Sequence, residues 1–187
     1  MEYTSQKTSP AFFAGAAKED ITPTLPLRLA GFGDRQGNYA AVREPLYVRC
    51  LYLKQNAVQA MLLSADLLWW GRALVERVQQ EAALRFGLPP HNILLSATHN
   101  HSGPPTDNHV LEQLETYSPE YTDFLLHQTL KAMEQALHHA HPASLSRWTG
   151  QCALNVNRRL MVKGKIEMMP NYQAPRDTAL TLLRLQG

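Results

Sequence analysis

Residues 57–105 run in the order strand, helix, strand, and this order constrains the fold more than any other feature of the chain. Residues 57–67 form an apolar run of strand length. Residues 71–86 place apolar side chains at helical spacing, and Gly87 with the prolines after it provides a stop signal. A second apolar run begins at His91. The pattern predicts a βαβ unit, in which the two strands lie parallel and the helix covers the sheet.

The flanking segments extend this unit into a larger sheet. Residues 46–53 are apolar on both faces of an alternating pattern, which is typical of an interior strand, and the turn at 54–56 predicts an antiparallel pair with residues 57–67. The elements together predict an α/β fold with a mixed sheet flanked by helices. The other expected elements are strands at 11–21, 144–154 and 178–185, a hairpin at 161–169, and a helix from Ser118 to His139 with Leu126, Leu130, Met133 and Leu137 as its buried stripe.

The composition is that of a soluble globular domain. With 187 residues, of which 44% are hydrophobic and 18% charged, we expect a single domain over residues 1–187. The net charge is +2 and the basic residues are scattered, so a nucleic-acid partner is not expected. No window approaches the about 18 apolar residues of a transmembrane segment. The N-terminus lacks a signal peptide, so we expect a cytoplasmic protein, or a secreted one where a signal has been removed. Cys50 and Cys152 are expected to be free thiols.

Two histidines follow the second apolar run. If the strand continues through them, His99 and His101 point to one side and Asn100 points to the other. Neutral imidazoles side by side suit zinc, with one ring binding the metal and the other binding it or holding a water. The alternative is an incidental His-x-His pair at the edge of a polar loop, because a catalytic zinc usually has three protein ligands.

Asp66 ends the first strand of the βαβ unit, at the same end of the sheet as His99. Ligands favour the carboxyl ends of parallel strands, so this end is the expected site. Asp66 would either orient a metal-binding histidine or cap the following helix.

Several other segments have both a functional and a structural interpretation. The Gly-rich loop at 29–37 would either approach a ligand closely or simply connect two strands, and the sequence favours neither. Asp107 and His109 could reach a metal, but a solvated loop is the preferred interpretation. The cluster of His138, His139 and His141 resembles a metal tract, yet cations at a helix C-terminus interact favourably with its dipole.

Four segments carry a resemblance to a known family. Residues 94–104, Leu-Leu-Ser-Ala-Thr-His-Asn-His-Ser-Gly-Pro, resemble the Ser-Gly-Thr-His-Thr-His-Ser-Gly-Pro segment of the neutral (non-lysosomal) ceramidases. Residues 62–67 resemble that family's Val-Ser-Ala-Asp-Leu strand end, and residues 14–23 its first strand. Residues 155–159, Asn-Val-Asn-Arg-Arg, are similar to its Asn-x-Asn-Arg segment. The matches occur in family order over most of the chain.

The resemblance implies a zinc-dependent hydrolase of N-acyl amide bonds, which converts ceramide to sphingosine and a fatty acid. It implies that His99 is a Zn²⁺ ligand, that His101 is an acid/base or transition-state contact, and that Arg158 contacts the substrate. The family's other zinc ligands, a second His, a Glu and a Tyr, lie beyond the strand that residues 178–185 resemble. We therefore expect an incomplete catalytic domain, inactive as this short chain, whose open sheet edge could self-associate.

Two alternatives remain open. Another kind of metal-dependent hydrolase is one, although an amidohydrolase barrel carries His-x-His after its first strand, and a metallo-β-lactamase has Asp where this chain has Gly103. The other is a non-enzymatic α/β module that binds a partner. If the chain is part of an enzyme, the expected substrate is a small-molecule or lipid amide.

Overall fold

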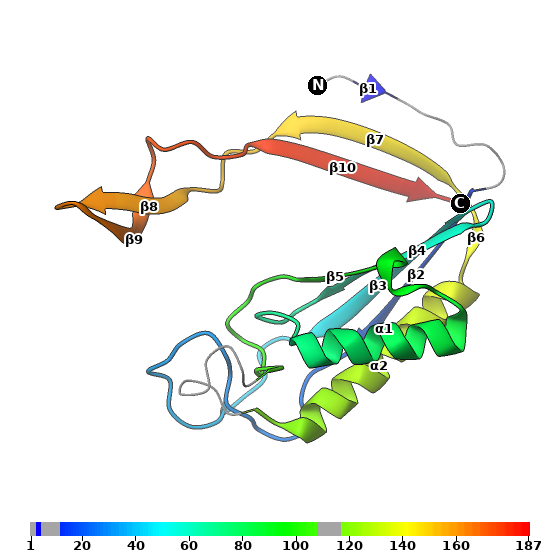
Figure 1. The fold of residues 1–187 in the computed structure, drawn as a ribbon, viewed down its shortest axis with the longest axis horizontal. Helices are drawn as coiled ribbons and strands as arrows, with labels where there is room; N and C mark the ends of the chain where they lie inside the picture. Colours follow the sequence, from blue (N-terminus) through cyan, green and yellow to red (C-terminus); the bar gives the residue numbers. More distant parts are fainter. Residues whose placement is uncertain (1–2, 5–11, 108–116) are drawn as a thin grey trace. The chain divides into compact units, whose positions relative to one another are not determined.

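A computed structural model of the chain describes residues 3–4, 12–107 and 117–187. The chain divides into two compact units, one of residues 10–142 and one of residues 1–9 with 143–187. The expectation of a single domain over residues 1–187 stays a prediction. The elements (Figure 1) are β1 (Tyr3–Thr4), β2 (Phe12–Asp20), β3 (Tyr47–Gln55), β4 (Val58–Ala65), α1 (Arg72–Phe86), the short 3₁₀ helix Pro90–Asn92, β5 (Ile93–Ala97), α2 (Pro119–His138), β6 (His141–Pro142), β7 (Ser144–Gln151), β8 (Asn157–Val162), β9 (Lys165–Asn171) and β10 (Ala179–Gln186).

The larger unit contains a five-stranded mixed sheet in the order β5-β4-β3-β2-β6. Strand β4 runs parallel to β5 and antiparallel to β3, and β3 runs antiparallel to β2. The helix α1 joins β4 to β5, as the βαβ pattern predicted. The predicted α/β fold with a mixed sheet and flanking helices is therefore confirmed, and β3 is the interior strand that its two apolar faces indicated.

Both helices cover one face of this sheet (Figure 1). The alternate residues Val48, Cys50 and Tyr52 of β3 point into the core beneath them and are at most 3% exposed. The other face carries a cross-strand apolar row, because Leu51 pairs with Leu62 and Leu62 with Leu94. Leu94 is 60% exposed, so the sheet has one buried and one largely exposed apolar face.

The helix signals in the sequence act as expected. Gly87 ends α1 in the left-handed conformation, with φ 65°, and the Ser118 hydroxyl accepts a hydrogen bond from the Tyr121 N–H at the start of α2. The buried face of α2 is rotated relative to the prediction. Leu130 and Met133 are buried, but Leu125 is buried in place of Leu126, and Ala136 in place of Leu137. Small residues face the sheet because β2 approaches the helix backbone closely.

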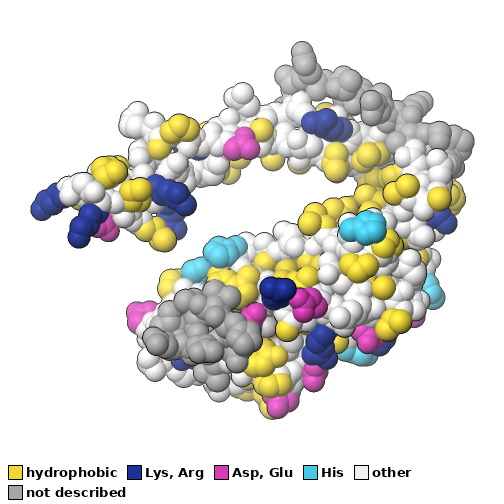
Figure 2. Space-filling model, viewed as in Figure 1, with side chains coloured by type: hydrophobic (Ala, Val, Ile, Leu, Met, Phe, Trp, Pro, Cys, Tyr) yellow, Lys and Arg dark blue, Asp and Glu magenta, His cyan; other side chains and the backbone are white. Residues whose placement is uncertain are grey.

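The smaller unit consists of strands and connecting segments. In it β1, β7 and β10 form an antiparallel sheet in the order β1-β7-β10, and β8 and β9 form a separate hairpin. The predicted strands and the hairpin turn at Lys163-Gly164 are thus confirmed, with positive φ at both turn residues. Apolar and basic side chains gather on the β8–β9 hairpin (Figure 2). None of residues 143–187 is buried, so this part of the unit contains no core residue.

The sequence made two predictions about the surface of the protein. Within the part of the chain that the structure describes, no helix combines the length and apolarity needed to cross a membrane. The strand β10 pairs with β7 and lies at the edge of its sheet, while self-association through such an edge stays a prediction.

Candidate functional site

The segment after β5 does not continue as a strand, contrary to the expectation for His99 and His101. The strand ends at Ala97. The Thr98 N–H then donates to the carbonyl of Ala65, the last residue of β4, and the Asn100 N–H donates to the Leu67 carbonyl beyond it. His99 itself has a φ of 56°, which histidine adopts more readily than most residues. Strand alternation therefore does not set the directions of the two rings.

His99 has one ring nitrogen engaged and one unengaged. Its Nδ1 lies 2.9 Å from the Leu68 carbonyl oxygen. Because a carbonyl only accepts hydrogen bonds, Nδ1 must carry the proton, and in the neutral ring Nε2 then has a lone pair. His99 is an exposed residue, which is compatible with a ligand reaching this lone pair. Metal-bound histidines commonly have this arrangement, with the second ring nitrogen donating to a carbonyl or carboxylate.

The ring of His101 lies next to that of His99 by another route. The ring centroids are 5.7 Å apart and meet edge to face. The Phe32 ring packs against the His101 ring, also edge to face, at 4.7 Å. The Nδ1 atom of His101 is buried without a hydrogen-bond partner. The two histidine rings are therefore neighbours, as predicted, although the backbone reaches this arrangement through the left-handed conformation of His99 and not through strand alternation.

The Gly-rich loop at 29–37 lies against His101, which favours the functional interpretation of this loop. Gly31 has a φ of 99°, and a Cβ at this position would collide with Cγ and Nδ1 of the His101 ring. The Arg35 guanidinium donates to the His101 carbonyl oxygen at 2.9 Å, and the Ala30 N–H donates to the Gly103 carbonyl at 2.9 Å. The sequence did not single out Arg35, because its partner lies 66 residues away. The glycines of this loop were the available signal that the loop approaches another group closely, and Gly31 is the one that does so.

Asp66 has neither of the two roles predicted for it. Its Oδ2 accepts from the Tyr47 N–H at 2.9 Å and from the Arg49 guanidinium at 3.0 Å, so its partners lie on β3. Gly71, not Asp66, is the N-cap of α1. Asp66 therefore joins the ends of β3 and β4.

The N-terminus of α1 is capped by residues from a distant segment. The Gly71 N–H donates to the Thr106 hydroxyl, and the Arg72 N–H donates to Asp107. Asp107 is 8% exposed, so the prediction of a solvated loop is wrong at this residue. Its carboxylate stabilises the positive end of the helix dipole. His109 lies outside the described residues.

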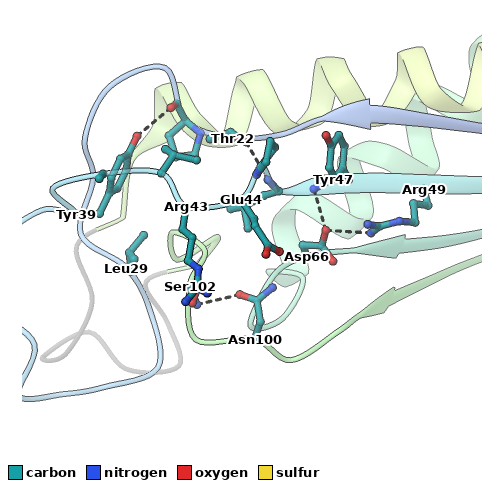
Figure 3. Close-up of a pocket in the computed structure, with 15 residues that line it drawn as sticks. Thr22, Leu29, Tyr39, Arg43, Glu44, Tyr47, Arg49, Asp66, Asn100 and Ser102 are labelled. Carbon is teal, nitrogen blue, oxygen red and sulfur yellow. Dashed lines mark hydrogen bonds and ion pairs between the residues drawn. The ribbon is translucent and has the colours of Figure 1, made fainter.

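A cavity of about 760 Å³ lies beside the histidine segment. Figure 3 shows Asp66, Asn100 and Ser102 among its lining residues, with Asp66 joined to Tyr47 and Arg49. Neither His99 nor His101 lines it. The expectation that Asn100 faces away from the histidines therefore agrees with the cavity lining, and the histidine site is separate from this cavity.

The remaining candidates lie elsewhere. Near the end of α2, His139 and His141 turn their Nδ1 atoms to the backbone carbonyls of Ala16 and His139 respectively. Arg158 lies at a β-bulge near the start of β8 and is exposed. Bulges often redirect a side chain. Arg158 belongs to the smaller unit, and its participation in the site stays a prediction.

The fold and the paired histidines define this chain as a mixed α/β protein, whose candidate ligand site lies at the carboxyl end of two parallel strands. The chain belongs to the neutral/alkaline non-lysosomal ceramidase family, because the model of that family's N-terminal region matches residues 12–187.

Two solved structures have the same fold. A neutral ceramidase from Pseudomonas aeruginosa matches with a TM-score of 0.72 and 19% identity, over 81% of this chain and 25% of that chain. A ceramidase complexed with C2 matches with a TM-score of 0.78 and 17% identity, over 95% of this chain and 29% of that chain. This chain thus spans between a quarter and a third of their lengths. Comparison with curated proteins gave no significant match.

The donor atoms can be tested for their fit to zinc. His99 fits, because its Nδ1 is held by a carbonyl, which leaves the lone pair of the neutral ring on Nε2, and the residue is exposed. Among the described residues, no group of three or more His, Cys, Asp or Glu side chains is placed to hold a metal ion. His139 and His141 share the contact from Nδ1 to a carbonyl, but His99 combines it with a place after the parallel strands β4 and β5 and beside the ring of His101.

Proposed function

We propose that this chain supplies one histidine ligand, His99, to a zinc-dependent hydrolase that cleaves N-acyl amide bonds. The observation that carries the proposal is the hydrogen bond from Nδ1 to the Leu68 carbonyl, which directs the Nε2 lone pair outward at the carboxyl end of β4 and β5. Family membership supports the reaction class. The other metal ligands would come from outside the described residues.

The proposed roles of the side chains follow from their chemistry. His99 holds the metal, His101 contacts the oxygen of the amide that is cleaved, and Arg158 binds a polar group of the substrate through its fork of N–H donors. When bound, zinc supplies a polarised carbonyl and a water of lowered pKa, about 7. The preferred substrate is a lipid amide of the ceramide type, giving sphingosine and a fatty acid, because the matching structures are ceramidases.

Zinc titration of the protein tests this proposal. Calorimetry or a chromophoric chelator in competition should show one weak site per chain, since most catalytic zinc sites use three protein ligands. The His99→Ala variant should lose this site. The matched control is His127→Ala, which removes an exposed histidine of α2 and should bind zinc as the parent does. Equal zinc uptake by all three proteins would reject His99 as a ligand, and no zinc uptake by any of them would favour the non-enzymatic α/β module.

A further inference from the structure

The two site histidines have opposite environments at the same ring atom. In His99, Nδ1 faces the Leu68 carbonyl oxygen at 2.9 Å. In His101, Nδ1 is buried and has no hydrogen-bond partner. Its neighbour is Gly31, whose Cβ position would lie 2.6 Å from Nδ1 if the residue carried a side chain. The Nδ1 atom of His99 thus faces a hydrogen-bond acceptor, whereas the Nδ1 atom of His101 faces Gly31.

These environments determine where the proton of each neutral ring resides. A neutral imidazole has one N–H and one lone pair, and the partners of the nitrogens decide between the two tautomers. At His99 the carbonyl requires N–H on Nδ1. At His101 an N–H on Nδ1 would be a buried donor with no acceptor, which is the rarer and costlier kind of unpaired polar group. The lone pair is tolerated there, because a Cα–H group is at most a weak donor to it.

The second nitrogen of His101 is differently placed. Nε2 of this ring is not among the buried unpaired atoms of the described residues, so it either meets solvent or has a partner. A proton on Nε2 is therefore not placed as a buried donor without an acceptor, as a proton on Nδ1 would be.

We propose that Gly31 and Arg35 are positioning residues that hold His101 as the Nε2–H tautomer, so that His101 is a hydrogen-bond donor to the substrate and not a base. Only the identity of the acceptor, an amide carbonyl oxygen or the oxyanion formed from it, rests on the proposed function. The lone pair of His101 is enclosed against Gly31 and cannot take a proton from a group in front of the ring. The site thus presents one lone pair, from His99, beside one N–H, from His101.

Three residues, Gly31, Phe32 and Arg35, fix this arrangement. Arg35 donates to the backbone carbonyls of Ala30 and His101, which ties the two loops together. The Arg35 guanidinium also lies 4.9 Å from the centroid of the Phe32 ring, and Phe32 packs on the His101 ring. Gly31 then closes the Nδ1 edge. The absence of a side chain at Gly31 is what allows the ring to lie flush with the loop.

Nitrogen-15 NMR of the ring nitrogens measures the tautomer directly. In neutral histidine the protonated and unprotonated nitrogens resonate in well-separated regions, and each is correlated with the carbon-bound ring protons. Spectra are recorded at about pH 9, where ordinary imidazoles are neutral. Signals of His99 and His101 are assigned by their loss in His99→Gln and His101→Gln. We expect Nδ1–H for His99 and Nε2–H for His101.

Paired glycine variants test the role of the loop. Gly31→Ala places a methyl group against Nδ1 and should displace the ring, so that the His101 signals move toward a mixture of tautomers. Gly37→Ala is the matched control, because Gly37 belongs to the same loop and also has positive φ, 70°, but nothing lies within 4 Å of its Cβ position. It should share the backbone strain and leave the His101 signals in place. Arg35→Ala should broaden or shift them, and Arg35→Lys should restore them only in part.

The outcomes separate this inference from the zinc proposal. A predominant Nδ1–H form, or an even mixture, in the parent protein would overturn the inference, as would identical His101 spectra for the two glycine variants. Should Gly31→Ala fail to fold, the parent spectrum and the Arg35 pair still decide. Added zinc should shift only the Nε2 signal of His99. If zinc shifts neither ring while the tautomers are as expected, the metal proposal fails and the tautomer assignment stands.

Discussion

Asp66 provides a test of how the carboxyl end of the sheet is held together. Its Oδ2 accepts from the Tyr47 N–H at 2.9 Å and from Arg49 at 3.0 Å. The carboxylate side chain is 19% exposed, whereas the Arg49 side chain is 48% exposed. A hydrogen bond to a charged acceptor contributes about 1.5–3 kcal/mol, and a solvated ion pair contributes about 0–1 kcal/mol. The backbone bond should therefore dominate.

Two substitutions separate these contributions. Asp66→Ala removes the acceptor and leaves the Tyr47 N–H unpaired, so it should lower the free energy of unfolding by about 2 kcal/mol. Asp66→Asn keeps an oxygen that can accept from Tyr47 but removes the charge, so the loss should be about 1 kcal/mol or less. With a urea m-value of about 2 kcal/mol/M, the midpoint of Asp66→Ala should fall by about 1 M.

Urea unfolding followed by tryptophan fluorescence and circular dichroism is the assay. The control is Glu76→Ala, which removes the exposed i,i+4 pair with Arg72 and should cost no more than about 0.5 kcal/mol. If Asp66→Asn destabilises the protein as much as Asp66→Ala does, the ion pair dominates and the reasoning is refuted. It is refuted equally if Asp66→Ala behaves like the Glu76 control.

Two further predictions concern the core. Burial raises the pKa of the Cys50 thiol from 9.0 to about 12, so the folded state keeps a proton that the unfolded chain loses in that interval. The stability from this group is complete below about pH 9 and is lost as the pH rises toward 12; at about pH 10.5 the loss should be about 2 kcal/mol relative to pH 8. Urea titrations should show a smaller alkaline loss in Cys50→Ala, and an equal loss would contradict this account. Gly15→Ala should cost about 1–3 kcal/mol, because its Cβ would collide with the Ala136 carbonyl of α2. Gly150→Ala, whose Cβ meets nothing within 4 Å, is the control, and equal thermal stability of the two variants would refute the collision.

Local sequence patterns predicted the elements of this fold well. Alternation identified β3, helical spacing identified α1, and Gly87 and Ser118 marked helix ends through backbone chemistry that involves only near neighbours. The buried face of α2 was harder, because Leu126 and Leu137 look like central core residues but are only partly buried at its margin. The core side is decided by the close approach of Gly15 on β2, which a helix pattern does not contain.

The site depends on contacts that span many residues, and this explains why the sequence located it but did not describe it. The spacing of His99 and His101 suggested neighbouring side chains on a strand. The rings are neighbours, yet the strand has ended before them, and the backbone there bonds to the end of β4 and to Leu67 beyond it. Leu68 and Gly31 decide what the Nδ1 atom of each ring faces. The sequence does not show which nitrogen of each histidine ring carries the proton, because the hydrogen-bond partners of the ring decide this. The sequence could therefore name the residue types of the site, whereas their division into lone pair and donor required the loop packing that the fold supplies.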